Sequence, residues 1–398
     1  MTPLTRDDLC ALDADDPLAP FRARFRLPDG RIYVNGNSLG PLPRAALQAL
    51  DEVVKGDWGK LGGRAWGQRD WLARASRVGA RVASLIGAAP DEVIIADSTS
   101  INLYKMLMGA LSLRPGRRVV LTEAGNFPTD RYIIDSVAQV AALQVRVVER
   151  PRLEEALTEE VAVVALTHVD FRSGARHDMA GLNALARHAG ALTLWDLSHS
   201  AGAIEVDLAA SQADLAVGCT YKFLNGGPGA PAFLYVARRH QDAIAAALPG
   251  WMGHADPFAF AAAYRPADGI ARHLSGTPPI LALAAMEPGI AMLEEAGIAQ
   301  VAAKSARLGD LLIRLVHERL ETGAIAIASP MDARQRGAQV SLRHPRAAAL
   351  VAAMEAMGVI ADYRPPDLIR FGLAGLYLSH GDMWEAVAAL TQALKAVA

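Results

Sequence analysis

The sequence has little cysteine, no lysine- or arginine-rich block and no apolar run approaching the roughly 20 residues of a membrane span. Its 398 residues contain two cysteines, Cys10 and Cys219. Their number and separation exclude a disulfide framework and indicate a reducing compartment, so we expect a cytoplasmic protein. Acidic residues stand early in the chain, where a signal peptide would need an apolar segment. The formal net charge of −2, without a basic cluster, argues against nucleic acid or a membrane surface as a partner.

The chain is rich in apolar segments, and these alternate between two patterns. Seven strand-like runs lie at 92–96, 117–122, 143–149, 161–167, 191–196, 214–218 and 232–236. Helical patterns separate most of them, at 99–111, 129–142 and 180–190. Several strands are apolar on both faces, which is typical of a parallel sheet covered by helices. We therefore predict an α/β fold with a large, doubly wound, mostly parallel sheet.

The pattern changes in the last third of the chain, which indicates a second, smaller α+β domain. A helix-rich stretch at about 281–322 is followed by short strands and two more helices, expected at 324–328, 338–342, 368–372, 346–357 and 382–397. A length of 398 residues suits two domains better than one. We expect a large domain at 50–275, a small domain at 276–398, and an N-terminal segment, 1–49, that packs with the small domain.

Polar and aromatic side chains follow the predicted strands, at the sheet edge where ligands bind in folds of this kind. The run 97-DSTS-100 opens a helix with hydroxyl and N–H groups suited to a phosphate. The run 126-NFPTD-130 places an aromatic ring before another helix. Asp196 ends the fifth strand, and Lys222 follows the sixth within 218-GCTYKFLNGGPG-229, a run with no acidic residue to pair it.

Each of these features alone has an ordinary structural explanation, such as a helix cap, a core ring, a turn aspartate or a solvated lysine. Together they supply what pyridoxal 5'-phosphate requires, namely a phosphate site, a stacking ring, an acid for the pyridinium nitrogen and a lysine for the aldehyde. Partial burial without a carboxylate partner lowers a lysine pKa and favours the neutral amine that attacks an aldehyde. The sequence thus predicts this cofactor, and no metal site.

Six runs resemble the kynureninase family, a group of fold-type I pyridoxal phosphate enzymes, in its bacterial form. They are 35-NGNSLGPLP-43, 126-NFPTD-130, 195-WDLSHSAGA-203, 220-TYKFLNGGPG-229, 251-WMGH-254 and 275-SGTPPI-280. The resemblance runs almost from end to end and keeps the order of the motifs. It implies hydrolysis of the Cβ–Cγ bond of L-kynurenine to anthranilate and L-alanine in tryptophan breakdown, by a homodimer with shared active sites.

The resemblance also implies a role for each site residue. Lys222 would bond to the cofactor aldehyde, Asp196 would pair with the pyridine nitrogen, and Tyr221 would donate a proton. Further cofactor contacts would come from Thr99, Ser100 and Tyr221 at the phosphate, from Phe127 stacked on the ring, from Asp130, Thr167 and His199 in the pocket, and from Trp251 and Thr277 of the second subunit.

The substrate contacts follow from the same resemblance. Arg370, in 370-RFGL-373, would clamp the substrate carboxylate, a task that suits a bidentate guanidinium. Trp66 and Thr277 would face the aryl ring of the substrate. A bulky tryptophan and a short threonine offer little to an extra ring hydroxyl, which predicts a preference for kynurenine over 3-hydroxykynurenine.

Other functions are less compatible with the residues. A cysteine desulfurase needs a cysteine on a mobile loop, whereas Cys219 stands three residues before Lys222 and Cys10 lies near the N-terminus. A cofactor-binding regulator would need a basic DNA-binding module. A nicotinamide dehydrogenase would need a GxGxxG loop after the first strand, and 96-ADSTSIN-102 has no glycine. An aminotransferase of related fold stays open and is distinguished by its products.

Overall fold

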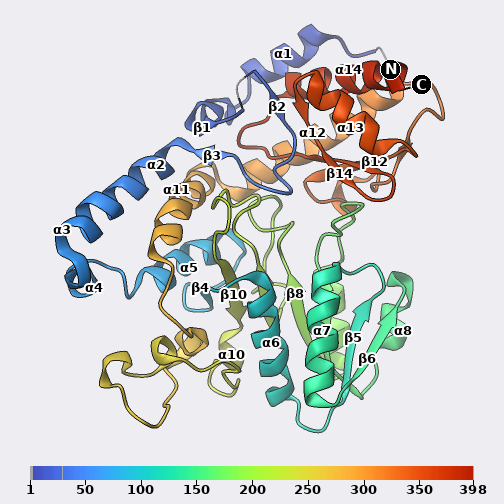
Figure 1. Cartoon of the computed structure of the whole chain (residues 1–398). Coiled ribbons are helices and arrows are strands. Elements are labelled where there is room, and N and C mark those ends of the chain that lie inside the picture. The colour runs from blue at the N-terminus through green and yellow to red at the C-terminus, as the bar shows by residue number, and fades with distance from the viewer. Residues whose placement is uncertain (1–2, 29, 398) are drawn as a thin grey trace.

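Seven strands form the larger of two main sheets in the computed structural model, which describes residues 3–28 and 30–397 (Figure 1). Their order across the sheet is β4-β10-β9-β8-β7-β5-β6. The strands are β4 (Val93–Ala96), β5 (Val119–Glu123), β6 (Gln144–Val148), β7 (Val161–Thr167), β8 (Leu192–Asp196), β9 (Leu215–Gly218) and β10 (Ala232–Val236). Strand β10 pairs antiparallel with both neighbours, and the other pairings are parallel. The predicted mostly parallel sheet is confirmed.

Helices cover both faces of this sheet, as the apolar character of its strands requires. They are α5 (Arg74–Leu85), α6 (Thr99–Leu113), α7 (Pro128–Ala141), α8 (Leu153–Ala156), α9 (Met179–His188) and α10 (Arg238–Gln241). Figure 1 shows α6 and α7 side by side on one face. Neighbouring residues determine where these two helices begin. The Ser98 hydroxyl caps α6, and Pro128 occupies the first turn of α7. Both helix N-termini therefore lie at the carboxyl ends of the strands before them.

A four-stranded antiparallel sheet with helices packed on it forms the smaller, α+β part of the molecule. Its strand order is β11-β12-β15-β14. The elements are β11 (Ala326–Ile327), β12 (Gln339–Arg343), β14 (Asp362–Arg364), β15 (Leu368–Gly372), α12 (Ile298–Arg319), α13 (Ala347–Ala356) and α14 (His380–Val397). Helix α11 (Ile280–Ala296), which precedes α12, packs on α2 (Arg44–Asp51) and α5. Strand β11 is shorter than predicted, and the pattern did not reveal β14 or β13 (Val359–Ile360).

The N-terminal residues pack on this smaller part, so both ends of the chain lie together (Figure 1). Strand β2 pairs with β13 in parallel, and helix α1 packs on α14. The segment contains α1 (Arg6–Ala14), β1 (Phe25–Arg26), β2 (Ile32–Tyr33), β3 (Leu42–Pro43) and the start of α2. A π-helix (Glu52–Trp58), α3 (Gly59–Leu61) and α4 (Ala65–Gln68) follow it. The residue limits of the domains remain a prediction.

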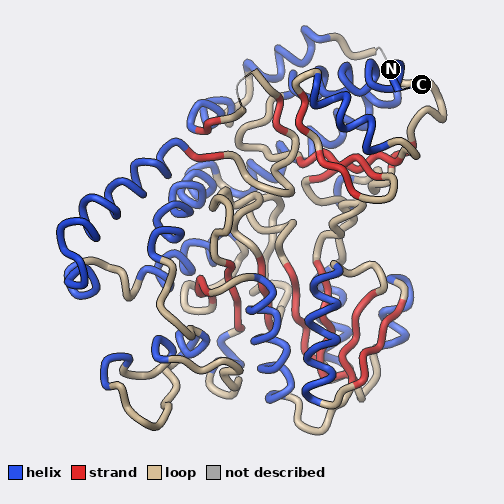
Figure 2. Tube along the Cα trace, in the orientation of Figure 1, coloured by secondary structure: helices blue, strands red, loops and turns tan. Residues whose placement is uncertain are grey.

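Short 3-10 helices occupy several connections, at Ala19–Arg24, Gly62–Arg64, Arg150–Arg152, Trp251–Gly253, Pro257–Ala259, Gly269–His273 and Ala333–Gln335. Figure 2 shows the two sheets as separate groups of strands with loops between them. The smaller sheet meets the strand ends of the larger one, since Arg370 of β15 and Gln339 of β12 both donate to the carbonyl oxygen of Phe171, which follows β7. No helix within the described residues is both long enough and apolar enough to cross a bilayer.

Candidate active site

Lys222 lies in the loop that leaves β9, with its amino group against a histidine. Nζ is 3.4 Å from Nε2 of His199 and 5.8 Å from the ring centroid of Tyr221. Burial lowers the pKa of His199 well below its usual value, and the charge of Lys222 lowers it further. The imidazole is therefore neutral, and it offers the amino group a hydrogen bond without adding a charge.

Two buried carboxyl groups, Asp196 at the end of β8 and Asp130 in the first turn of α7, influence each other electrostatically. Asp196 Oδ1 accepts from the Ser198 N–H at 2.7 Å, and Asp130 Oδ2 accepts from the Thr167 hydroxyl at 3.2 Å. Burial raises the pKa of Asp196. Burial and the charge of Asp196 raise that of Asp130 well above its usual value. Because the pKa of Asp130 is raised further than that of Asp196, we expect a proton shared by the pair to lie on Asp130.

This arrangement predicts that Asp130→Asn stabilises the cofactor-free protein at alkaline pH. As pH rises through the usual carboxyl pKa, the unfolded chain releases the Asp130 proton while the folded chain retains it, so folding stability falls. Asparagine has no proton to release and can still donate to Asp196. We expect its unfolding midpoint to exceed the parent's by about 2 °C or more at pH 8, with a smaller difference at pH 5. Asp135→Asn, an exposed change on the same helix, is the control. A variant less stable than the parent at pH 8 would contradict the shared proton.

The aromatic ring of Phe127 is held from two sides. Phe171 meets it edge to face with ring centroids 5.1 Å apart. The side-chain oxygen of Asn126 accepts from the Phe127 N–H at 2.9 Å and from the Thr167 hydroxyl at 2.6 Å. Asn126 is the first residue of the motif 126-NFPTD-130, but it was not predicted to be a site residue. It ties the ring to the end of β7.

The N-terminus of α6 brings Thr99 and Ser100 into the first helical turn at this edge of the sheet. A helix of this length presents N–H groups and a positive dipole end to an anion. The neighbouring Asp97 carboxylate would repel an anion, but it pairs with the buried amino group of Lys105 at 2.5 Å. The sequence pattern did not indicate this neutralising pair.

Arg370 of β15 reaches the same strand ends from the smaller sheet. Its guanidinium is buried and donates to the Asp362 carboxylate at 2.7 Å, the Phe171 carbonyl at 2.6 Å and the Ser38 hydroxyl at 3.2 Å. Ser38 comes from the N-terminal segment. The family resemblance implied Arg370 but neither of its partners. Ser38 meets Asp362 from 324 positions away, and Asp362, eight positions from Arg370, reaches it only through the pairing of β14 with β15.

Three predicted site residues do not meet Lys222 within one chain. Trp66 lies in α4, which Figure 1 shows far from the strand ends, and its ring packs edge to face on Trp71. Trp251 is 36% exposed and stacks on Phe260. Thr277 lines a cavity of about 190 Å³ with residues 95–97. Their roles remain predictions that need a second chain.

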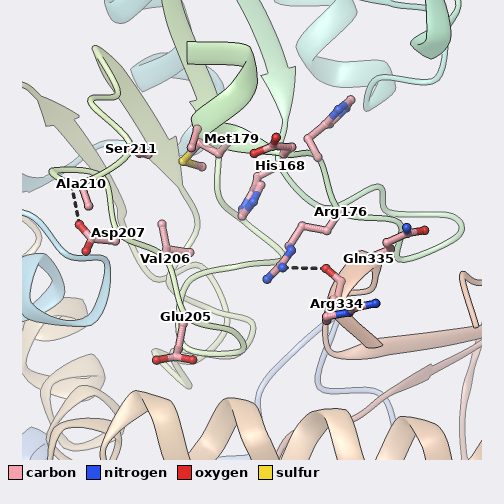
Figure 3. Close-up of a pocket in the computed structure, with 13 residues that line it drawn as sticks. His168, Arg176, Met179, Glu205, Val206, Asp207, Ala210, Ser211, Arg334 and Gln335 are labelled. Carbon is pink, nitrogen blue, oxygen red and sulfur yellow. Dashed lines mark hydrogen bonds between the residues drawn. The ribbon is translucent and has the colours of Figure 1, made fainter. Parts of the chain in front are cut away.

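A cavity of about 630 Å³ lies outside this constellation (Figure 3). It lies between the loops after β7 and β8 and residues 334–335 of the smaller part, and contains none of the predicted site residues. His168, which faces it, hydrogen-bonds the Ser200 hydroxyl, and burial lowers its pKa to about 3. Arg176 donates to the Arg334 carbonyl oxygen across the cavity. Two of its polar side chains, His168 and Arg176, thus have local partners.

Comparison with known proteins identifies the family. Residues 301–390 match the family model described as the kynureninase C-terminal domain. A kynureninase of Deinococcus radiodurans is 46% identical over 392 residues, covering 97% of this chain and 95% of its own. A kynureninase of Pseudomonas fluorescens is 44% identical over 397 residues, covering 98% and 95%.

Solved structures of lower identity are similar in fold. A cysteine desulfurase of Thermococcus onnurineus has a TM-score of 0.82 at 19% identity, covering 95% of this chain and 98% of its own. One of Escherichia coli has a TM-score of 0.80 at 18% identity, with the same coverage. These two likenesses show the fold alone, whereas the closer relatives above show that the chain belongs to the kynureninase family.

Proposed function

We propose that the protein hydrolyses the Cβ–Cγ bond of L-kynurenine to anthranilate and L-alanine, with pyridoxal 5'-phosphate as cofactor. The observation that carries the proposal is the meeting of a lysine amino group, a neutral histidine and a buried carboxylate at one sheet edge, in a chain of this family. We further propose that kynurenine is preferred over 3-hydroxykynurenine.

The residues at the strand ends fit the cofactor. Lys222 offers an amine to its aldehyde, Asp196 offers a buried negative charge to its pyridine nitrogen, and the α6 N-terminus offers N–H groups to its phosphate. Phe127 supplies a ring held in one orientation by Phe171. When bound, the cofactor withdraws electrons from the carbon atoms attached to the substrate amine.

Lys222 and Tyr221 are the proposed proton carriers. Once the substrate amine replaces it, the Lys222 amine can take the Cα proton, because the adjacent His199 is neutral and does not compete as a charge. Burial raises the pKa of Tyr221, so its phenol keeps its proton at neutral pH and can donate it to the departing carbon. Asp196 stays negative because Asp130 holds the shared proton.

The cysteine desulfurase alternative is disfavoured by the environment of Cys219. Its side chain is 3% exposed, its N–H donates to the Ser198 hydroxyl at 3.1 Å, and burial raises its thiol pKa. A protonated, enclosed thiol is a poor sulfur acceptor. The aminotransferase alternative would yield a keto acid in place of alanine.

We propose a homodimer in which Trp251 and Thr277 reach the cofactor of the partner subunit and Trp66 contributes to its aryl pocket. Support comes from the exposed aromatic group formed by Trp251, Phe258 and Phe260, whose rings contact one another at the surface. Clustered exposed aromatic rings are typical of protein interfaces. A cytoplasmic location remains a prediction.

Side-by-side kinetics with the two substrates test both parts of this proposal. We expect the holoenzyme to release anthranilate and alanine from L-kynurenine, followed by anthranilate fluorescence and amino acid analysis. We expect kcat/KM for 3-hydroxykynurenine to be lower by at least about tenfold, since a pocket without a partner for the hydroxyl must desolvate it. Equal values would contradict the preference alone. A keto acid product would contradict the hydrolytic function.

A further inference from the structure

One carboxylate, that of Asp362, joins two arginines on adjacent strands of the smaller sheet. Arg370 Nε donates to its Oδ2 at 2.7 Å, and Arg364 Nη1 donates to its Oδ1 at 2.9 Å. Asp362 is the register partner of Arg370 across β14 and β15. The backbone pairing therefore places both guanidinium groups around one fixed anion.

The Ser38 hydroxyl sits between the same two guanidinium groups. It donates to Asp362 Oδ2 at 3.1 Å and accepts from Nη2 of Arg364 and Nη2 of Arg370, each at 3.2 Å. A hydroxyl has one hydrogen and two lone pairs, so these three bonds use its whole capacity. A carboxylate oxygen at this position would accept from both arginines in charge-assisted bonds, which are stronger.

The charges around Ser38 favour an incoming anion. Two guanidinium groups face one carboxylate, and Asp170, which also faces Arg370, is engaged by the Ser173 hydroxyl and N–H of its own loop. The positive field extends to His199, whose pKa is lowered first by burial and then by Lys222, Arg370 and Arg364. The cation pair and the lysine therefore act on the same buried histidine.

Arg364 and Arg370 differ in how far their side chains are exposed to solvent. The Arg370 side chain is 1% exposed, whereas that of Arg364 is 37% exposed. Arg364 is therefore accessible to a ligand from solvent, whereas Arg370 is enclosed.

We propose that Arg364 is a second carboxylate-binding residue, which holds the substrate α-carboxylate together with Arg370 in the position of the Ser38 hydroxyl. Asp362 is the positioning residue that keeps the two guanidinium groups at this spacing. This inference deepens the proposed function and rests on it for the identity of the substrate. The chemistry it requires is an α-amino acid carboxylate.

The test uses two probes that differ only in the carboxylate, L-alanine and ethylamine, titrated into the holoenzyme and followed by the cofactor absorbance. Arg364→Gln should weaken L-alanine binding by at least about tenfold, the loss of one charge-assisted contact, and change ethylamine binding less than about twofold. Arg364→Lys should recover part of the L-alanine affinity. With L-kynurenine, Arg364→Gln should raise KM by a similar factor and change kcat less than about threefold.

Arg343→Gln is the matched control, because Arg343 pairs with Asp367 at the surface of the same sheet. It should leave the binding of both probes unchanged. L-alanine binding by Arg364→Gln within twofold of the parent would overturn the proposal, and so would equal weakening of both probes, which is the result of a purely structural role. The binding of L-alanine and ethylamine can be measured even if L-kynurenine is not cleaved. If the parent protein did not cleave L-kynurenine, the proposed function would be rejected, but the binding of L-alanine and ethylamine would still test the role of Arg364.

Discussion

Replacing Lys222 with alanine should lower kcat for L-kynurenine by at least about 10⁴-fold, because one amino group is expected to capture the cofactor and to carry the Cα proton. Alanine can do neither, and His199, which is neutral and buried, is the nearest described base left in its place. Initial rates from anthranilate fluorescence measure the loss. Lys395→Ala, a change at an exposed lysine of α14, should turn over at the parent rate.

The covalent role of Lys222 has its own readout. Borohydride treatment of the parent holoenzyme should fix the cofactor mass to the peptide that contains Lys222, detected by mass spectrometry. The alanine variant should show no such peptide. If the alanine variant turned over L-kynurenine at a normal rate, or if the label appeared on another lysine, the assignment would be wrong.

Replacing Asp196 with asparagine should lower kcat by about 10³-fold or more while the protein keeps its fold. The buried carboxylate is expected to keep the pyridine nitrogen protonated through a charge-assisted hydrogen bond, and an amide cannot balance that charge. Asp196→Glu, which keeps the charge, should retain more activity than asparagine. An asparagine variant within tenfold of the parent, about 1.4 kcal/mol of barrier, would rule out this role.

The electrostatic interaction between Asp196 and Asp130 allows a further test of the Asp196 prediction. Without the charge of Asp196, the pKa of Asp130 falls back toward its usual value, because that charge is one cause of its rise. Burial still raises that pKa, but the positive pyridinium nitrogen would favour ionised Asp130, which we expect to take over part of the charge balance. The double variant with asparagine at both positions should therefore be slower than Asp196→Asn, and equal rates would show that Asp130 does not compensate.

The large sheet was predictable because its strands are short apolar runs separated by helical periods. Strands β7 and β10 have the predicted bounds, and the others differ by one or two residues at one or both ends. Strand β14 was missed for a physical reason. Its three residues, Asp362–Arg364, carry two charges and no alternation, and only pairing with β15 makes them a strand.

The residues of the candidate site were likewise predicted only in part. Asp196 ends one buried strand and Lys222 follows another, so their positions in the order of strands, taken together, indicated the site. Asn126, Ser38 and Asp362 act through side-chain contacts that the order of strands does not reveal, and Ser38 meets Asp362 across 324 positions. Trp66 was assigned by resemblance, and one chain alone does not bring it to the site.

The contact of Ser38 with β14 and β15 has a consequence for the order in which the protein is made. Vectorial synthesis delivers Ser38 early, and Lys222 follows long before Arg364 and Arg370. A nascent chain that stops before residue 362 would hold the lysine, the carboxyl pair and the phosphate-facing helix, but neither guanidinium. Such a chain would contain the residues proposed to bind the cofactor. It would lack Arg364 and Arg370, which are proposed to favour amines that carry a carboxylate. If the proposed carboxylate site is correct, discrimination between amino acids and other amines would begin only after residues 362–370 have been synthesised and have packed against Ser38.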